Sequence, residues 1–471
     1  DIIPTVKDSE LYKTFALTDS SGEFEIFPAD DPKCQIILNN SSCIVPDTIT
    51  KRYNMNSERW IYSRLKRDNL FLTFDYDLSS NLTFFSDVLY YKSDTIQNNS
   101  PSAAFSTSRI IVPANNYWNP FGPVNFNDGR ANPNRVRLNI AGQDISQSIP
   151  DDGLPILIDW YRYVDVGPRV VNVEKDTYRF LFGLRGASKN WRWETAIFTS
   201  KANTDDITSN RLSNSLVEEA LSLSTPDAYN PFNGGGNYIN YLSTGNDGTP
   251  STNSSIKNAI IDVYRKGERK LNSFDFKITN DSILSIKSGK ISFAGGLEFR
   301  SDKFTDDRDP RLDGTIKYID KDGDTYPFVS DVMNSSPTPD NSGKRDVFSA
   351  YAEFLVPLIS EEMNLFFAKS MNLQIAGRFE DFSDVGSKSV PKIAIGWEVN
   401  KNLFIRGSLS KGFRVPNLVQ INESIVSRQL SRDDAYLCLQ QIRAQGAIDD
   451  CDYSIQRLSL IHISEPTRPR I

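Results

Sequence analysis

Adjacent acidic residues are the side chains whose types and spacing could support acid–base chemistry in this chain. Asp151-Asp152 and Asp306-Asp307 each place two carboxyl groups next to each other. Both pairs lie in polar stretches, so we interpret them as solvated loop charges. The sequence has no G-x-S-x-G motif, and its single histidine, His462, lies close to the C-terminal end. The sequence therefore predicts a protein that is not an enzyme.

The segment from Asp320 to Asp324 could bind a metal, because Asp-Lys-Asp-Gly-Asp partly resembles the oxygen-rich loop of a calcium site. It lacks the distal glutamate of an EF-hand, so we favour a polar turn at Gly323. The cysteines do not have the C-x-x-C spacing of a zinc site. We expect neither a metal ion nor a cofactor.

Apolar residues recur at every second position in many stretches, which indicates β-strands with one apolar and one polar face. Residues 177–185, 291–300 and 372–380 show this alternation clearly, and we expect strands of about ten to twelve residues. A tilted strand needs roughly 9–11 residues to cross the hydrocarbon layer of a membrane. The sequence has no uninterrupted apolar run of 18 residues, so a transmembrane helix is not expected.

The connections between the predicted strands alternate in length. Short ones lie near 78–81, 187–190, 285–290 and 399–402, and long polar ones span about 93–154, 202–270, 304–344 and the residues from 416 onward. Outer-membrane barrels have short periplasmic turns and long extracellular loops, so the alternation predicts such a barrel. We assign the apolar piece from Pro155 to the Gly167-Pro168 turn to the extracellular side and do not count it as a crossing strand. This leaves about ten crossing strands.

The net charge of −7 gives no basic surface for nucleic acid.

The segment from Ser408 to Leu418 carries a family resemblance. It reads Ser-Leu-Ser-Lys-Gly-Phe-Arg-Val-Pro-Asn-Leu and resembles the S-x-G-F-R-A-P-x-L signature of TonB-dependent outer-membrane receptors, with Val415 in place of the commoner alanine. Earlier segments resemble, in the same order, the YAEL-x-VPL, AGRYEDYSDFG and PK-x-G-x-x-W segments of that family. These segments are residues 351–358, 373–386 and 391–397, and residues 119–122 and 229–232 resemble its YNPFG loop motifs.

The resemblance implies a barrel of roughly 22 antiparallel strands around a plug, of which this chain would supply about ten. We therefore expect an all-β, antiparallel transmembrane barrel fragment in the outer membrane of a Gram-negative bacterium. The implied function is active uptake of a scarce nutrient, such as a siderophore, cobalamin, an oligosaccharide or a peptide, bound by the extracellular loops. The implied partners are outer-membrane lipid, the small ligand and the inner-membrane TonB complex, which acts through the plug. A passive porin and a secreted β-rich adhesin are the alternatives.

The same resemblance assigns a structural role to Gly412, Phe413, Arg414 and Pro416. They lie where a strand leaves the membrane, so that glycine gives backbone freedom and proline ends the ladder. Direct contact of Arg414 with the ligand is the alternative.

The four cysteines form two local pairs in polar stretches, Cys34 with Cys43 and Cys438 with Cys451. Local pairs in an envelope protein can oxidise, so we expect two disulfide bonds on the extracellular side. Four unpaired thiols are the alternative.

We expect residues 1–457 to form a partial barrel domain that lacks the plug and further strands. Residues 458–471 resemble the translation of a sequencing-library adapter, so we exclude them from the domain. This tail contains Pro466 and Pro469, which cannot donate to a ladder, and we predict that it joins no strand.

The alternation also assigns faces to the last three strands. The residues expected to face lipid are Leu373, Ile375, Phe379, Ile393, Ile395, Trp397, Leu403, Ile405 and Leu409. Those expected to face the lumen are Gln374, Arg378, Glu380, Lys392, Glu398, Arg406 and Ser408.

Overall fold

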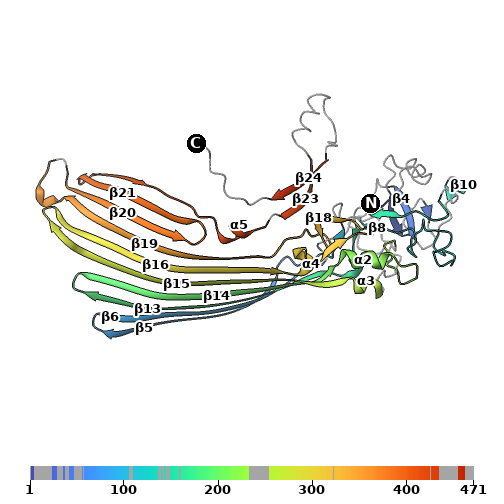
Figure 1. Ribbon diagram of the computed structural model, residues 1–471, viewed down its shortest axis with the longest axis horizontal. Helices are drawn as coiled ribbons and strands as arrows, with labels where there is room; N and C mark the ends of the chain where they lie inside the picture. The colour runs from blue at the N-terminus through green and yellow to red at the C-terminus, as the bar shows by residue number, and fades with distance from the viewer. Residues whose placement is uncertain are drawn as a thin grey trace, which may run out of the picture.

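A ten-stranded antiparallel sheet is the main element of the chain (Figure 1). The computed structural model describes residues 56, 58–104, 110–135, 149–158, 161–232, 254–321, 323–366 and 368–424, and only the backbone of short strands within 2–46, 139–144 and 426–461. The strands follow one another in space as in sequence: β5 (Arg64–Ser79), β6 (Leu82–Asn99), β13 (Arg169–Ser188), β14 (Trp191–Leu212), β15 (Ile260–Ile286), β16 (Gly289–Arg308), β19 (Asn341–Ile359), β20 (Ser370–Phe382), β21 (Gly386–Asn400) and β22 (Leu403–Ser410). The sheet is not closed, and β5 and β22 are its edges. The prediction of about ten antiparallel strands is confirmed.

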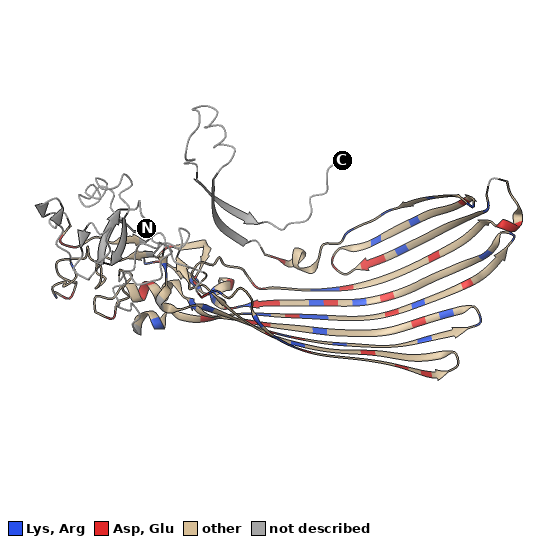
Figure 2. Cartoon of the chain, turned by 180° about the vertical axis from the view of Figure 1, so that it is seen from behind, with Lys and Arg blue, Asp and Glu red and all other residues tan. Residues whose placement is uncertain are grey.

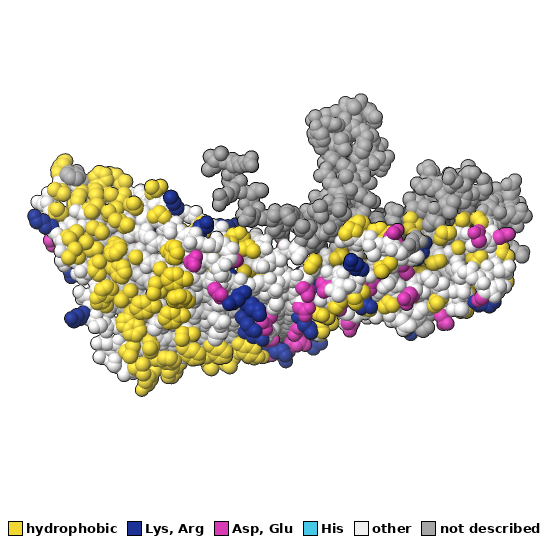
Figure 3. Space-filling view, in the orientation of Figure 1, with side chains coloured by type: hydrophobic (Ala, Val, Ile, Leu, Met, Phe, Trp, Pro, Cys, Tyr) yellow, Lys and Arg dark blue, Asp and Glu magenta, His cyan; other side chains and the backbone are white. Residues whose placement is uncertain are grey.

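The register sorts the side chains onto two faces, because residues directly opposite each other on neighbouring strands point to the same side. One row contains Ile197, Phe274, Phe299 and Phe348. The row beside it, on the other side of the sheet, contains Ala196, Asp275, Glu298 and Ser349. We call these sides the apolar face and the charged face. Figure 2 marks acidic and basic positions along the strands, and Figure 3 shows hydrophobic side chains gathered over one end of the sheet.

The last three strands separate the two predicted sets of residues. Leu373 lies opposite Ile395, and Ile393 lies opposite both Ile375 and Leu409, which places them on the apolar face. Gln374 lies opposite Ala394, which in turn lies opposite Ser408, on the charged face. The predicted separation of these residues onto two faces is confirmed.

The central strands are longer than the sequence predicted. β14, β15 and β16 have 22, 27 and 20 residues, where about ten to twelve were expected. Both ends of the predicted loops 202–270 and 304–344 are therefore strand. The boundaries were wrong because a strand outside the hydrocarbon layer can be polar on both faces, so the alternation of hydrophobicity ends before the hydrogen-bond ladder does.

Short turns lie at one end of the sheet, which we call the turn end, and long connections lie at the other, the loop end (Figure 1). The predicted short turns join β5 to β6, β13 to β14, β15 to β16 and β21 to β22. Two connections depart from this rule. Residues 383–385 make a tight turn between β20 and β21 at the loop end, and residues 360–369, with the 3-10 helix η3 (Glu361–Met363), join β19 to β20 at the turn end.

The long connections fold together at the loop end around a core of their own. Its fully buried large side chains are Tyr163, Tyr229, Phe121, Phe232, Ile149 and Ile156. The elements here are β7 (Ala103–Ala104), β8 (Ile110–Val112), β9 (Asn139–Ile140), β10 (Gln143–Asp144), β11 (Ile156–Ile158), β12 (Tyr161–Arg162), η2 (Val164–Val166), α2 (Asn214–Leu221), α3 (Ser254–Asn258), α4 (Pro310–Asp313), β17 (Lys317–Ile319) and β18 (Thr325–Ser330). A six-stranded sheet joins β8 and β11 to β1 (Ile2–Pro4), β2 (Phe24–Pro28), β3 (Ile36–Ile37) and β4 (Ser42–Pro46). The placement of the apolar piece before Gly167 outside the crossing strands is confirmed.

Both Asn-Pro-Phe motifs hold this core in the same way. The side-chain oxygen of Asn119 accepts a hydrogen bond from the amide of Phe121, and that of Asn230 accepts one from the amide of Phe232, each at 2.9 Å. The two phenylalanine rings are fully buried. Gly153, at φ 78°, packs against the first motif where a Cβ would lie 2.5 Å from the backbone of Gly122. The motifs therefore stabilise the loops by local turns and burial.

A buried carboxylate joins its own segment to two others at the loop end. Asp331 accepts hydrogen bonds from the hydroxyls of Ser213 and Ser215, at 2.7 and 2.6 Å, and from Nε of Arg311 at 3.0 Å. Nearby, burial and a hydrogen bond to Glu218 raise the pKa of Tyr318, so its phenol remains a donor.

The prediction that the tail joins no strand is wrong for its first residues. β24 (Ser454–Ile461) pairs with β23 (Val426–Asp433), and Leu458 lies opposite Gln429. The two strands form a separate hairpin and do not extend the ten-stranded sheet. Pairing is possible because the prolines of the tail follow this strand, so each residue up to Ile461 has an amide to donate. The side chains of the four cysteines and His462 lie outside the described residues, so the disulfide bonds stay predictions.

Among the residues that the structure describes, no helix has the length and apolar character needed to cross a membrane. In the acidic segment at 320–324, the Asp320 carboxylate accepts hydrogen bonds within its own turn, from the amide of Asp324 and the hydroxyl of Tyr326, both at 2.8 Å.

Candidate functional site

The predicted motif around Gly412 leaves β22 and folds back against the neighbouring strands. Arg345 on β19 donates from Nη2 to the carbonyl oxygen of Pro416 at 2.9 Å. The ring of Phe413 packs edge-on against that of Phe382 at the end of β20, with centroids 6.0 Å apart. Arg414 is exposed. The chain direction after β22 is thus set by contacts of Pro416 and Phe413.

Arg345 also connects this segment to the tight turn between β20 and β21. Its guanidinium donates from Nε and Nη2 to the carboxylate of Asp384, at 2.9 and 2.7 Å, and lies 5.6 Å from the centroid of the Phe382 ring. The planar fork of arginine matches a carboxylate in this geometry.

A short helix, α5 (Leu418–Asn422), follows the motif and packs on β19. It begins at Asn417, whose side chain accepts from the amide of Gln420 at 2.8 Å, while the Gln420 side chain accepts from the amide of Asn417 at 3.0 Å. This capping box satisfies two amides that a helix start leaves free. Leu418 is buried, so the helix is held by its first residue.

A hollow of about 730 Å³ lies between α5, residues 338–341 and the loop-end parts of β13 to β16. Its strand residues include Lys175, Asp206, Arg265, Asp306 and Arg308, all of which alternation places on the charged face. The hollow is of the size that small-molecule sites have in proteins. It is our candidate ligand site.

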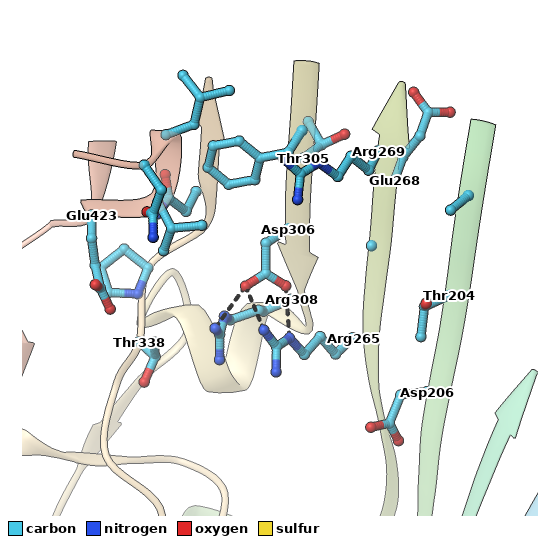
Figure 4. Close-up of a pocket in the computed structure, with 18 of the residues that line it drawn as sticks. Thr204, Asp206, Arg265, Glu268, Arg269, Thr305, Asp306, Arg308, Thr338 and Glu423 are labelled. Carbon is cyan, nitrogen blue, oxygen red and sulfur yellow. Dashed lines mark hydrogen bonds and ion pairs between the residues drawn. The ribbon is translucent and has the colours of Figure 1, made fainter. Parts of the chain in front are cut away.

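Ion pairs between β15 and β16 organise the floor of the hollow (Figure 4). The Asp306 carboxylate accepts from Nε and Nη2 of Arg265, at 2.7 and 2.9 Å, and from Nη2 of Arg308 at 2.7 Å. Four residues further along each strand, Arg269 forms the same forked pair with Asp302. The site therefore presents fixed guanidinium and carboxylate groups, which can bind the polar groups of a small ligand by charge-assisted hydrogen bonds.

The sequence interpretation of Asp306 as a solvated loop charge was wrong. Asp306 lies in β16, where polar residues occupy both faces and hide the strand pattern. A usable signal was the four-residue spacing of Arg265 and Arg269 on one strand and of Asp302 and Asp306 on the next, since such spacing keeps side chains on one face. Asp151 and Asp152 are exposed in a turn, as expected.

Comparisons with known proteins agree with this architecture. The family model described as "TonB dependent receptor-like, beta-barrel" matches residues 147–437, more than half of the 471 residues. None of the curated proteins matches the chain.

Three solved structures are similar, each with 11% sequence identity. The FpvAI–pyocin S2 complex has a TM-score of 0.37, with 78% of this chain and 37% of that chain covered. A mutant ferric enterobactin receptor, PfeA from Pseudomonas aeruginosa, has a TM-score of 0.38, with 77% and 35% covered. The ferripyoverdine receptor of the Pseudomonas aeruginosa outer membrane, bound to ferripyoverdine, has a TM-score of 0.37, with 79% and 36% covered. The chain thus spans 35–37% of the length of these solved chains. By its match to the family model, the chain belongs to the TonB-dependent receptor-like β-barrel family.

Proposed function

We propose that the chain is part of a receptor that imports a scarce nutrient through the outer membrane, with energy supplied by the inner-membrane TonB complex. The chain lies in the Gram-negative outer membrane, where its apolar face meets lipid and its charged face borders the lumen. The observation that carries the proposal is the hollow on the charged face, close to the folded loops at the loop end. A ligand captured by the loops would meet this site before it enters the lumen.

The groups in the hollow favour a polar ligand. Arg265 and Arg308 share Asp306, and Asp206 lies opposite Arg265, so the floor offers guanidinium and carboxylate groups together. Siderophores, cobalamin, oligosaccharides and peptides all carry oxygen atoms that can accept from such groups. TonB would act through the plug, which the family resemblance places before the barrel.

The motif from Gly412 to Pro416 then has a structural role in this receptor. The bond from Arg345 to the Pro416 carbonyl places α5 beside the hollow, so the motif shapes the site without contributing a ligand-binding side chain. The exposure of Arg414 agrees with this role.

Ligand binding to the intact receptor tests the proposal. Ferric siderophores, cobalamin, oligosaccharides and short peptides would be titrated into purified receptor and their binding measured by calorimetry. The Asp306→Asn variant should bind the selected ligand about tenfold more weakly, because both arginines lose their shared partner and reorient. Asp281→Asn is the matched control, since Asp281 pairs with Arg192 near the turn end and loses the same charge. If the Asp306→Asn variant and the unchanged receptor bind the ligand with equal affinity, the hollow is not part of the binding site. If the receptor binds none of the nutrients tested, the proposed function is contradicted.

A further inference from the structure

Asp206 on β14 places a carboxylate in the hollow beside α5. Within the described part of the chain, this carboxylate accepts no hydrogen bond and forms no ion pair, because the neighbouring Arg265 guanidinium is turned to Asp306. Figure 4 shows Asp206 apart from that ion-paired group. Burial raises the pKa of the Asp206 carboxyl more than the charges of Arg265 and Lys175 lower it. A cationic group of a ligand can therefore pair with Asp206.

The row that contains Asp206 crosses three strands on the charged face. Asp206 lies directly opposite Arg265 on β15, and Arg265 lies directly opposite Arg308 on β16. Neighbouring strands are about 4.8 Å apart, so Asp206 and Arg308 are about 10 Å apart across the sheet. Arg308 donates from Nη2 to Asp306, whereas its Nε is buried and has no hydrogen-bond partner among the described residues. The row thus has a carboxylate at one end and a guanidinium with an unused donor at the other.

Gly267 leaves the floor of the hollow open beside this row. It lies on β15, directly opposite Thr204 on β14 and Asp306 on β16. Among the described atoms, only the Cβ of Thr204 lies near an added Cβ at Gly267, at 3.8 Å. A glycine within a strand lets a ligand approach the backbone closely. A ligand can therefore lie against the strands between the two ends of the row.

The hollow offers groups of both charges and an acceptor for an amide. Its described lining includes four acidic and four basic side chains. Asn341 on β19 lies opposite Asp306, and its Oδ1 is buried without a hydrogen-bond partner in the described part of the chain. A peptide bond carries one donor and one acceptor, which could satisfy this oxygen and Nε of Arg308 when the two side chains turn toward the ligand. A neutral sugar offers no cation to Asp206, and an anion is repelled by it.

We propose that the hollow binds a short peptide of about three residues, with its terminal ammonium at Asp206 and its terminal carboxylate at Arg308. An extended chain spans about 3.3–3.6 Å per residue, so the termini of a tripeptide are about 10 Å apart and match the two ends of the row. Both termini then form charge-assisted hydrogen bonds, and the peptide backbone lies over Gly267. The inference rests on the proposed function, because it names the nutrient that the same hollow binds.

The test begins with a library of tripeptides that have free termini. The library is mixed with the purified intact receptor, and the bound peptides are identified by mass spectrometry. The tightest binder is then titrated by calorimetry beside its N-acetylated and C-amidated derivatives. Each blocked derivative should bind about tenfold more weakly than the free peptide, because each lacks one terminal charge. The dipeptide without the middle residue should also bind about tenfold more weakly, because it cannot reach both ends of the row.

Variants of the receptor assign the terminal ammonium to Asp206. Asp206→Asn should bind the free peptide about tenfold more weakly, and N-acetylation should then cause no further loss. The matched control is Asp205→Asn, which removes the same charge from the next residue on the opposite face and should bind as the unchanged receptor does. Gly267→Leu fills the floor and should weaken the binding of every tripeptide.

Three results would overturn the inference. In the first, no tripeptide of the library binds, and a ferric siderophore, cobalamin or an oligosaccharide binding instead would leave the proposed uptake intact. In the second, the free and blocked peptides bind equally. In the third, N-acetylation weakens binding to Asp206→Asn as much as to the unchanged receptor. If the peptide binds as expected but enters cells without TonB, the proposed uptake fails while this inference stands.

Discussion

Arg345 and Asp384 form a forked ion pair that ties β19 to the turn between β20 and β21, with Nε–Oδ1 and Nη2–Oδ2 distances of 2.9 and 2.7 Å. Their side chains are only 10% and 20% exposed. The same guanidinium holds the Pro416 carbonyl, so one side chain connects two segments that resemble family motifs.

Loss of this pair should destabilise the receptor. Asp384→Asn leaves Arg345 poorly solvated, and we expect the free energy of unfolding to fall by about 2–4 kcal/mol. Urea titration of the intact receptor in lipid vesicles measures it. Asp128→Asn, which breaks an exposed pair with Arg130, should leave the free energy of unfolding almost unchanged, because water screens an exposed ion pair. A similar, small loss in both variants would show that the Arg345–Asp384 pair is not structural.

An arginine on the apolar face should be costly near the middle of the membrane. Ile395 lies between Leu373 and Gly407 on this face, and Ile395→Arg should lower the free energy of unfolding by about 2–4 kcal/mol. Its neighbour Ala394 is on the charged face, and Ala394→Arg should be much better tolerated. If the two variants unfold alike in lipid titrations, the assignment of faces is wrong.

The loop core should unfold independently of the barrel strands when one of its rings is removed. Phe232→Ala leaves a cavity around a fully buried position, which costs about 3–5 kcal/mol. Hydrogen exchange should become faster in residues 113–123 and 214–232 and stay slow in β14 to β16. Phe366→Ala, at a fully exposed ring in the turn-end connection between β19 and β20, is the control and should change neither region. Unchanged exchange in the loops would contradict the role of the Asn-Pro-Phe motifs.

The sequence alone predicts the strands of the sheet in the part where contact with lipid requires alternating apolar residues. Leu373, Ile375 and Phe379 alternate with polar residues because one face must be apolar and the other borders water, and the order of short and long connections then gave the number of crossing strands. The pattern fails beyond the membrane. Around Asp206 and Asp306 both faces are polar, so strands that continue there were read as loops.

The candidate site could not be predicted because its residues meet only after folding. Arg265 and Asp306 are far apart in sequence and come together through the register of β15 and β16. Arg345 meets Asp384 because Asp384 lies in the tight turn between β20 and β21, a short connection at the end of the sheet where the other connections are long. The family motif around Gly412 indicated the strand end, but gave no sign that Pro416 would direct α5 toward the hollow.

Energy coupling is the most direct test of the proposed uptake. Accumulation of the ligand selected by the binding panel would be measured in cells that express the intact receptor, with and without the inner-membrane TonB protein and with the proton gradient collapsed. We expect the ligand to bind the cell surface in all conditions, but to accumulate neither in cells without TonB nor in cells without a proton gradient. Accumulation that continues without TonB or the proton gradient would identify a passive channel and contradict the account.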